Sequence, residues 1–288
     1  MPSLQQTRRR IASVKNTQKI TKAMKLVSAA KLRRAQDRIL KARPYALKMG
    51  ALLSNLGARV SRDVHPLLVR RPIRKVELVV VAADRGLCGS FNASIFRQAT
   101  DALRAHQAQG CAVSLTLVGR KARDYFRRRS LPTRYTVVNV FDKLSFDHAA
   151  DLARNEMDAY LAGAFDEAWL IYAEFKSAMS SVIRLQRLMP IEAETAASES
   201  GAGTDYLYEP SDEDLLADLV PRSIETQIWR ALLESAASEQ GARMMAMDSA
   251  SRNAKEMITK LTMVYNKTRQ AAITKELMDI VGGSEALK

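Results

Sequence analysis

The sequence predicts a mixed α/β protein, in which two long terminal helices pair as an antiparallel coiled coil beside an α/β domain. At both ends of the 288-residue chain, apolar side chains recur every three or four positions over long stretches. This spacing is typical of amphipathic helices. Between the two ends, short apolar runs alternate with amphipathic segments, a pattern that indicates a mainly parallel sheet covered by helices.

The C-terminal helical pattern, residues 211–283, is the longest in the chain. Its predicted seam consists of Ile224, Ile228, Leu232, Ala236, Gln240, Met244, Met247, Ala250, Ala254, Met257, Leu261, Val264, Thr268 and Ala271. Pro221 suits a first helical turn better than a helix interior, so we expect the uninterrupted helix to begin there. About sixty residues of helix would be roughly 90 Å long, and a helix that leaves a compact domain buries a narrow seam only against a second helix.

The N-terminal pattern, residues 1–57, supplies that second helix. Its predicted seam consists of Ile11, Val14, Ile20, Met24, Val27, Ala30, Ala35, Ile39, Ala42, Ala46, Met49, Leu53 and Leu56. Pro44 is expected to kink or interrupt the helix, because an interior proline removes a hydrogen bond and clashes with the preceding turn. Gly57 is expected to end it. An antiparallel pair of terminal helices fits these patterns best.

The central segment, residues 75–190, alternates strand and helix patterns. Its first strand, VELVVVAA at Val76 to Ala83, is a valine-rich run typical of a strand buried on both faces. Further strands are expected at 111–118, 135–141, 168–175 and 180–188, and helices at 92–106, 120–129 and 146–161. This series predicts a Rossmann-like α/β domain with a mainly parallel sheet. The acidic segment 191–205 that follows has no periodicity, and we expect an exposed loop.

Positive charge is concentrated at the N-terminus. The formal net charge is +14, and the first fifty residues hold fourteen Lys and Arg against one acid, Asp37. An acidic partner is therefore expected at this end. Tyr45 is the only aromatic residue between Met1 and Gly57, whereas single-stranded nucleic acid needs aromatic stacking platforms. The pattern favours a helix that presents charge to acidic protein loops, and a basic coiled-coil nucleic-acid-binding protein remains the alternative.

Motifs for catalysis or cofactor binding are weak. The turn after the first strand, DRGLCGS at Asp84 to Ser90, does not match the dinucleotide fingerprint, and the chain contains no phosphate loop. Its three histidines fall in different predicted elements, which suggests neither a metal site nor a catalytic triad. We therefore expect no catalytic residues, no cofactor and no metal, although an α/β enzyme with helical arms is a further alternative. No run approaches the roughly eighteen apolar residues of a membrane span, so a soluble protein is expected.

Five sequence blocks resemble the gamma subunit of the bacterial F-type ATP synthase, over nearly the whole chain. They are IASVKNTQKITKAMKLVSAAKLRRAQDR, DRGLCGS, DYLYEP, SEQGARMMAM and VYNKTRQAAITKELMDIVGG. The resemblance implies a central rotor shaft without catalytic residues of its own. It also implies four kinds of partner: the alpha and beta subunits of the catalytic head, the epsilon subunit and the c-subunit ring. Such a protein is peripheral to the membrane, at the cytoplasmic face of the bacterial inner membrane, and couples proton flow to ATP synthesis or hydrolysis.

The resemblance also implies contact residues. Those expected to face the alpha and beta head are Lys22, Met24, Lys25, Arg243, Arg269, Gln270, Thr274 and Glu276. Those expected to face epsilon and the c ring are Tyr206, Tyr208, Glu209 and Cys88. Gly241 and Met245 stand where another small or aliphatic residue is expected from the resemblance. The chain lacks the regulatory cysteine insertion of chloroplast relatives, so redox control is not implied.

Overall fold

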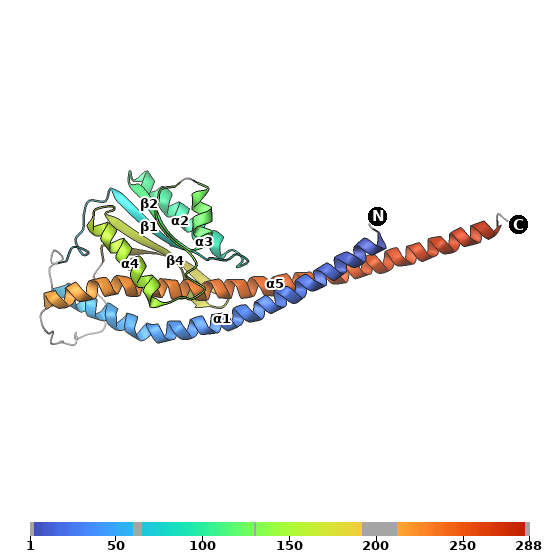
Figure 1. Cartoon of the computed structure of the whole chain (residues 1–288), viewed down its shortest axis with the longest axis horizontal. Coiled ribbons are helices and arrows are strands. Elements are labelled where there is room, and N and C mark those ends of the chain that lie inside the picture. Colours follow the sequence, from blue (N-terminus) through green and yellow to red (C-terminus); the bar gives the residue numbers. More distant parts are fainter. Residues whose placement is uncertain (1–2, 60–64, 130, 192–211, 286–288) are drawn as a thin grey trace. The chain divides into compact units, whose positions relative to one another are not determined.

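The computed structural model describes residues 3–59, 65–129, 131–191 and 212–285 (Figure 1). The elements are α1 (Leu4–Arg59), β1 (Lys75–Val81), α2 (Phe91–Ala108), β2 (Ala112–Val118), α3 (Arg120–Arg127), β3 (Thr133–Val137), α4 (Phe146–Leu161), β4 (Glu167–Ser177), β5 (Ser180–Met189) and α5 (Asp212–Glu285). The chain divides into two compact units. Unit 1 combines residues 1–29 with 243–288, and unit 2 comprises residues 30–242. The two long helices therefore contribute to both units, and the division cuts across the three segments expected from the sequence.

The centre of unit 2 is a five-stranded sheet in the order β3-β2-β1-β4-β5. The first four strands are parallel, and β5 runs antiparallel to β4. Val79, in the middle strand, lies opposite Thr116 on one side and Leu170 on the other. The parallel pairing of these four strands, and their alternation with helices, confirm the predicted mainly parallel α/β sheet.

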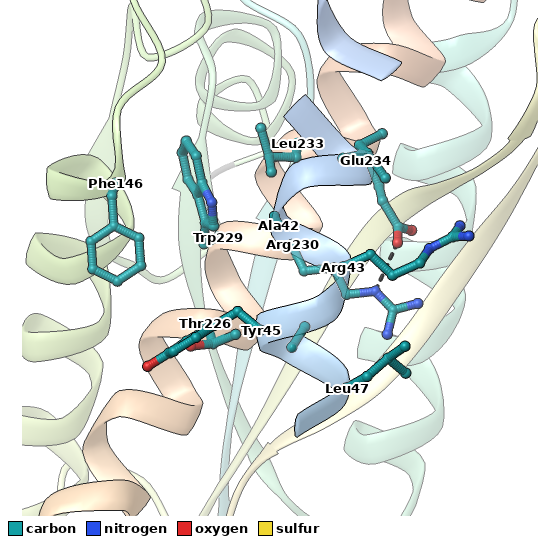
Figure 2. Close-up of a pocket in the computed structure, with 12 residues that line it drawn as sticks. Ala42, Arg43, Tyr45, Leu47, Phe146, Thr226, Trp229, Arg230, Leu233 and Glu234 are labelled. Atoms are coloured by element: carbon teal, nitrogen blue, oxygen red, sulfur yellow. Dashed lines mark hydrogen bonds and ion pairs between the residues drawn. The ribbon is translucent and has the colours of Figure 1, made fainter. Parts of the chain in front are cut away.

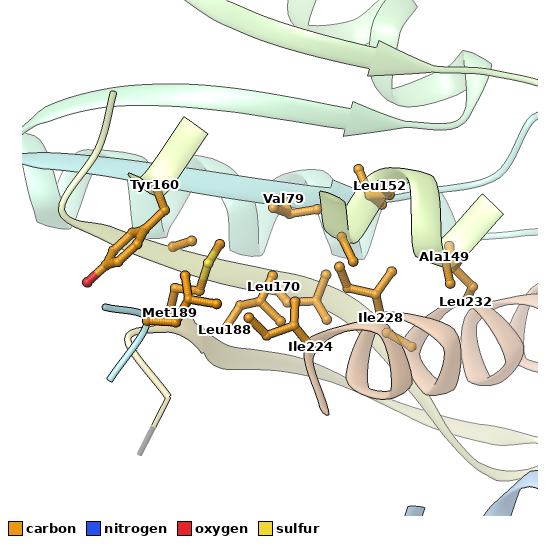
Figure 3. Packing of buried hydrophobic residues seen from close by; sticks show 14 of the residues in the cluster. Val79, Ala149, Leu152, Tyr160, Leu170, Leu188, Met189, Ile224, Ile228 and Leu232 are labelled. Carbon is orange, nitrogen blue, oxygen red and sulfur yellow. The ribbon is translucent and has the colours of Figure 1, made fainter. Parts of the chain in front are cut away.

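Each face of the sheet carries its own hydrophobic core, because successive side chains of a strand point to opposite faces. Val79 contributes to the core shared with α4 and the first part of α5, and Leu78 contributes to the core shared with α2 and α3. Figure 3 shows Ile224 and Ile228 of α5 pointing toward Leu170 of the sheet. All of these side chains are fully buried, so the first part of α5 is an integral layer of unit 2.

Some predicted boundaries are wrong. The helix α5 begins at Asp212, so Pro221 lies inside it, and α1 continues through Pro44 to Arg59, beyond Gly57. Pro44 is exposed, so water can bond the carbonyl that its missing N–H leaves free. The third strand ends at Val137, because the next segment is held by a side chain instead of a strand. Asp84 accepts hydrogen bonds from the backbone N–H groups of Asn139 and Phe141.

Unit 1 is a pair of helices that run side by side in opposite directions (Figure 1). The seam of α1 differs from the prediction. Ile20 and Val27 are 60% and 57% exposed, while Thr21 and Ser28, one position further on, are 8% and 2% exposed. Thr7 belongs to the same buried row, at steps of seven or fourteen residues, which is the heptad repeat of a coiled coil.

The last part of α5 shows the same kind of error. Met257 and Val264, which were predicted in the seam, are 51% and 48% exposed. Met247 and Ala254 are buried as predicted. Small side chains such as Ala, Ser and Thr allow two helix backbones to approach closely. The buried row of this pair is therefore not the most apolar row that the sequence offers, since it includes Thr21 and Ser28 in place of Ile20 and Val27.

Candidate partner-contact surfaces

The first part of α1 presents a row of cations to solvent. Six of its basic side chains are exposed, namely Arg8, Arg9, Arg10, Lys15, Lys19 and Lys22. In its buried row, the hydroxyls of Thr7 and Thr21 donate to the carbonyl oxygens of Ser3 and Gln18. Such back-bonding satisfies a buried hydroxyl without a partner helix. The cationic face is therefore available to an acidic partner.

Two lysines that the sequence analysis grouped together have different surroundings. Lys25 Nζ lies 2.5 Å from Asp248 Oδ1 of α5. The hydrogen bond from Lys25 holds the pKa of Asp248 below its usual value. Lys22 is exposed and makes no ion pair within the described residues. Lys25 therefore joins the two helices of unit 1, whereas the charge of Lys22 is available to a partner.

The contact residues expected on α5 also separate into two groups. Arg243 is only 8% exposed and is engaged within the protein, so little of it can meet a partner. Arg269, Gln270, Thr274 and Glu276 are all exposed. The hydroxyl of Thr274 donates to the carbonyl oxygen of Gln270 at 3.0 Å. Met24 on α1 is half-buried, so part of its thioether side chain reaches the surface.

Sequence reasoning missed an apolar surface at the end of α5. Every residue from Ile273 to Ser284 is exposed. Five of these are large apolar side chains with 48% to 68% exposure: Ile273, Leu277, Met278, Ile280 and Val281. A contiguous exposed apolar patch marks an interaction site. The signal is present in the sequence, because Ile273, Leu277 and Ile280 continue the spacing of three and four, but the predicted seam ends at Ala271.

The turn between β1 and α2 is built around its buried residues. Asp84 is 6% exposed and accepts the N–H of Arg120 at 2.9 Å. Cys88 is 2% exposed and its sulfur accepts a hydrogen bond from Asn92. The side chain of Cys88, which was expected to face epsilon and the c ring, therefore points inward. Leu87 is instead 66% exposed with a φ of 61°. The other residues expected at this surface, Tyr206, Tyr208 and Glu209, lie outside the described residues.

The histidines have structural surroundings. His148 Nδ1 accepts the backbone N–H of Ser145 at the start of α4, and His65 Nδ1 accepts the N–H of Leu67. Burial lowers the pKa of His65. In the described ranges, no three His, Cys, Asp or Glu side chains gather as a metal site. No helix in those ranges combines the length and apolar character needed to span a bilayer.

Unit 2 also contains an apolar hollow of about 600 Å³ between α1, α4 and α5 (Figure 2). Phe146 and Trp229 form an edge-to-face pair on its wall, with ring centroids 5.9 Å apart. The carboxylate of Glu234 accepts a hydrogen bond from Arg230 Nε at 2.7 Å. Most of the lining is apolar, and its polar side chains include Thr226, Arg230 and Glu234.

Comparison with known proteins identifies the family of the chain. A family model described as ATP synthase matches residues 3–287. The ATP synthase gamma chain of Anaeromyxobacter dehalogenans strain 2CP-C is 51% identical over 290 residues, which cover 100% of both chains. That of Geobacter sp. strain M21 is 48% identical over 288 residues, again with 100% coverage of both. The chain belongs to the ATP synthase gamma-chain family.

Solved structures agree with this family. A chain of the central stalk/c-ring structure of the Tetrahymena thermophila mitochondrial ATP synthase has a TM-score of 0.60 and 29% identity, covering 81% of this chain and 99% of that one. A rotor chain of the Euglena gracilis mitochondrial ATP synthase has a TM-score of 0.68 at 20% identity, with 94% and 98% coverage. The second likeness shows the fold alone. The mixed fold of this chain, with long terminal helices and an α/β sheet, is thus similar to that of chains in ATP synthase central stalks.

Proposed function

We propose that this chain is the central rotor subunit of an F-type ATP synthase, which couples proton flow to ATP synthesis or hydrolysis in a catalytic head. The observation that carries the proposal is full-length membership of the gamma-chain family. The helix pair of unit 1 supports it, because its exposed surfaces are suited to contact with other subunits. This family membership also disfavours the nucleic-acid-binding alternative.

The proposed partners are the alpha and beta subunits, the epsilon subunit and the c ring. Toward the head, we assign the exposed Lys22, Arg269, Gln270, Thr274 and Glu276, and also Met24, which is half-buried. Lys25 and Arg243 act within the rotor first, because Lys25 is paired with Asp248 and Arg243 is buried. We propose that their contacts inside the rotor keep the neighbouring exposed residues in position for contact with the head.

Tyr206, Tyr208 and Glu209 are proposed to face epsilon and the c ring. In the turn after β1, the proposed contact passes from Cys88 to its neighbour Leu87, since only Leu87 is exposed. A left-handed φ at a leucine is uncommon, and here it directs an apolar side chain out of the turn. Our proposed location is the cytoplasmic face of the bacterial inner membrane, where the chain is peripheral through its complex.

The proposed mechanism requires no catalytic residue in this chain. An asymmetric shaft presents different side chains to each beta subunit, and rotation changes which nucleotide-site conformation each beta subunit prefers. Coupling then consists of differential contacts with the conformational states. An exposed cation such as Lys22, which forms no ion pair with the residues that the structure describes, can contact one acidic loop after another as the shaft turns.

Reconstitution tests the proposal directly. The chain is assembled with alpha, beta, epsilon and the membrane sector, and ATP hydrolysis and proton pumping are measured in vesicles. We expect hydrolysis that drives pumping, and no hydrolysis by the isolated chain. Failure to assemble with alpha and beta, or nucleotide turnover by the chain alone, would contradict the proposed role.

Met24→Lys tests the assignment of the head surface. We expect a lower ratio of protons pumped to ATP hydrolysed, because a new cation beside an acidic loop would favour one angular position. Lys143→Gln is the control, since Lys143 is an exposed residue in the loop before α4 and has no proposed partner. An unchanged ratio in Met24→Lys would remove Met24 from the contact surface.

A further inference from the structure

Two carboxyl groups are buried between the sheet and α4 of unit 2. Glu77 of β1 and Glu156 of α4 are both 0% exposed. One cation reaches both: Arg134 of β3 has its Nε 3.3 Å from Glu77 Oε1, and its Nη2 donates to Glu156 Oε1. No other Lys or Arg in the described ranges pairs with either glutamate. If both were ionised, one buried negative charge would remain uncompensated, which is costly in a protein interior.

The hydrogen bonds distinguish the two glutamates. Both oxygens of Glu77 accept from hydroxyl groups of β2, one from Ser114 and the other from Thr116 at 2.6 Å. Hydrogen bonds of this kind stabilise the ionised form. Glu156 Oε1 accepts from Arg134, but Glu156 Oε2 is buried without a hydrogen-bond partner. A negative charge shared with a buried oxygen that accepts no hydrogen bond is costly. The geometry therefore assigns the charge to Glu77 and the proton to Glu156.

We propose that Glu77, Arg134 and Glu156 form a buried proton-binding site, in which Glu156 carries the proton and its loss loosens α4 from the sheet. Burial raises the pKa of Glu156 to about 7; the charge of Arg134 opposes this rise and that of Glu77 adds to it. The charged groups that face Glu156 are Glu77 from β1 and Arg134 from β3. The side chains of Ser114 and Thr116 on β2 are neutral, and the ring of Phe165 before β4 lies under Arg134.

The site lies near solvent and has a connection to the long helices. The side chain of Arg134 is 21% exposed, so the cluster lies close to solvent. At the other end of α4, Phe146 packs against Trp229 of α5. The carbonyl of Leu144, two residues earlier, accepts a hydrogen bond from Arg38 of α1 at 3.3 Å. A change in the packing of α4 against the sheet would therefore alter its contacts with the parts of α1 and α5 that lie in unit 2.

The direction of the pH effect follows from linkage. The pKa of Glu156 in the folded chain, about 7, lies above its ordinary value of 4.5. Between these two values the folded state keeps a proton that the unfolded state has lost, so stability falls as the pH rises through this window. Above the folded pKa the full cost of the buried charge is present, and below the ordinary value it is absent. The proposal is independent of the rotor assignment.

The test is amide hydrogen exchange on the full chain at about pH 6 and about pH 8.5, expressed as protection factors to remove the intrinsic pH dependence. We expect the protection of α4 to fall about tenfold or more at the higher pH, and Glu156→Gln to abolish that fall. Asp158→Asn is the matched control, because Asp158 is exposed on the same helix. It should respond to pH like wild type. In Glu77→Gln the midpoint should move to lower pH, because the neighbouring negative charge is gone.

Equal pH responses in wild type and Glu156→Gln would overturn the proposal, as would a wild-type α4 that is insensitive to pH. If Glu156→Gln does not fold, infrared spectroscopy of the wild-type chain decides. A carboxyl band of a buried protonated acid that disappears as the pH rises across this range supports the site. A spectrum with no such titrating band overturns it.

Discussion

Unit 1 and unit 2 bury different kinds of side chain. The row of α1 buried in unit 1 includes Thr7, Thr21 and Ser28, while the sheet of unit 2 buries Val79, Leu170 and many other aliphatic side chains. Unit 1 also leaves large apolar residues exposed. The free energy of burial is roughly proportional to apolar area. Unit 2 therefore has the larger stabilising core. The two helices of unit 1 gain less free energy from burial, and their exposed surface is available to partners.

The largest expected effect tests the core of unit 2. Ile228→Ala removes a fully buried side chain between α5 and the sheet and should lower the free energy of unfolding by about 2 to 5 kcal/mol. Chemical denaturation of the full chain measures this. A loss of less than about 1 kcal/mol would show that α5 is not an integral layer of the domain.

A second prediction concerns a close backbone approach at Gly241 of α5. A Cβ at Gly241 would lie 2.9 Å from the carbonyl oxygen of Ala178. Gly→Ala normally stabilises a helix interior, but here we expect Gly241→Ala to cost about 1 to 3 kcal/mol, because backbone must move. Gly282→Ala is the matched control, since its Cβ would meet nothing within 4 Å. Equal effects of the two changes in thermal unfolding would contradict the close approach.

A smaller and local effect is expected in unit 1. Lys25→Gln removes the nearer of two cationic partners of Asp248 and leaves Arg252, 3.4 Å away, in place. The pKa of Asp248 should therefore rise part of the way toward its ordinary value. Because the folded pKa of Asp248 is lowered, the stability from this pair is present at neutral pH and is lost as the pH falls through the folded pKa. Hydrogen exchange near Met247 should increase in Lys25→Gln at neutral pH, and in wild type only on acidification. Lys22→Gln should leave this exchange unchanged.

The smallest effect is expected where the sequence pattern predicted a buried seam. Ile20→Ser and Val27→Ser replace exposed side chains, so each should change the free energy of unfolding by no more than about 0.5 kcal/mol. Thr21→Val and Ser28→Val, their buried neighbours, serve as the comparison. If the two changes at Ile20 and Val27 destabilise unit 1 more than those at Thr21 and Ser28, the heptad register described above is wrong.

The local patterns determined most of the architecture. Valine-rich runs and amphipathic segments in alternation were sufficient to predict every strand and helix of the sheet domain, because the periods of two and 3.6 residues follow from backbone geometry alone. The end of β3 was wrong for a long-range reason. Asp84, far away in sequence, holds the backbone of Asn139 and Phe141, and no pattern within residues 135–141 reports that contact.

For the candidate contact residues, too, sequence and tertiary structure supply different information. The concentration of cations at the N-terminus and the family blocks pointed to a partner-binding surface, and both are properties of the sequence alone. Tertiary structure decided which residues belong to it: Lys25 is paired with Asp248, Cys88 is buried and Leu87 is exposed. Contact of the exposed residues with other subunits stays a prediction.

By itself, the sequence determined the kinds of element, their order and the charge of the N-terminal helix, because each depends on neighbours within a few turns of the chain. Only the tertiary structure decided which row of each long helix is buried. An amphipathic pattern with apolar residues on adjacent rows, such as Ile20 beside Thr21, allows two registers. The choice between them depends on how the partner helix packs, and that information lies outside either pattern. The same reasoning applies to Glu77 and Glu156, whose shared cation is supplied by a third strand.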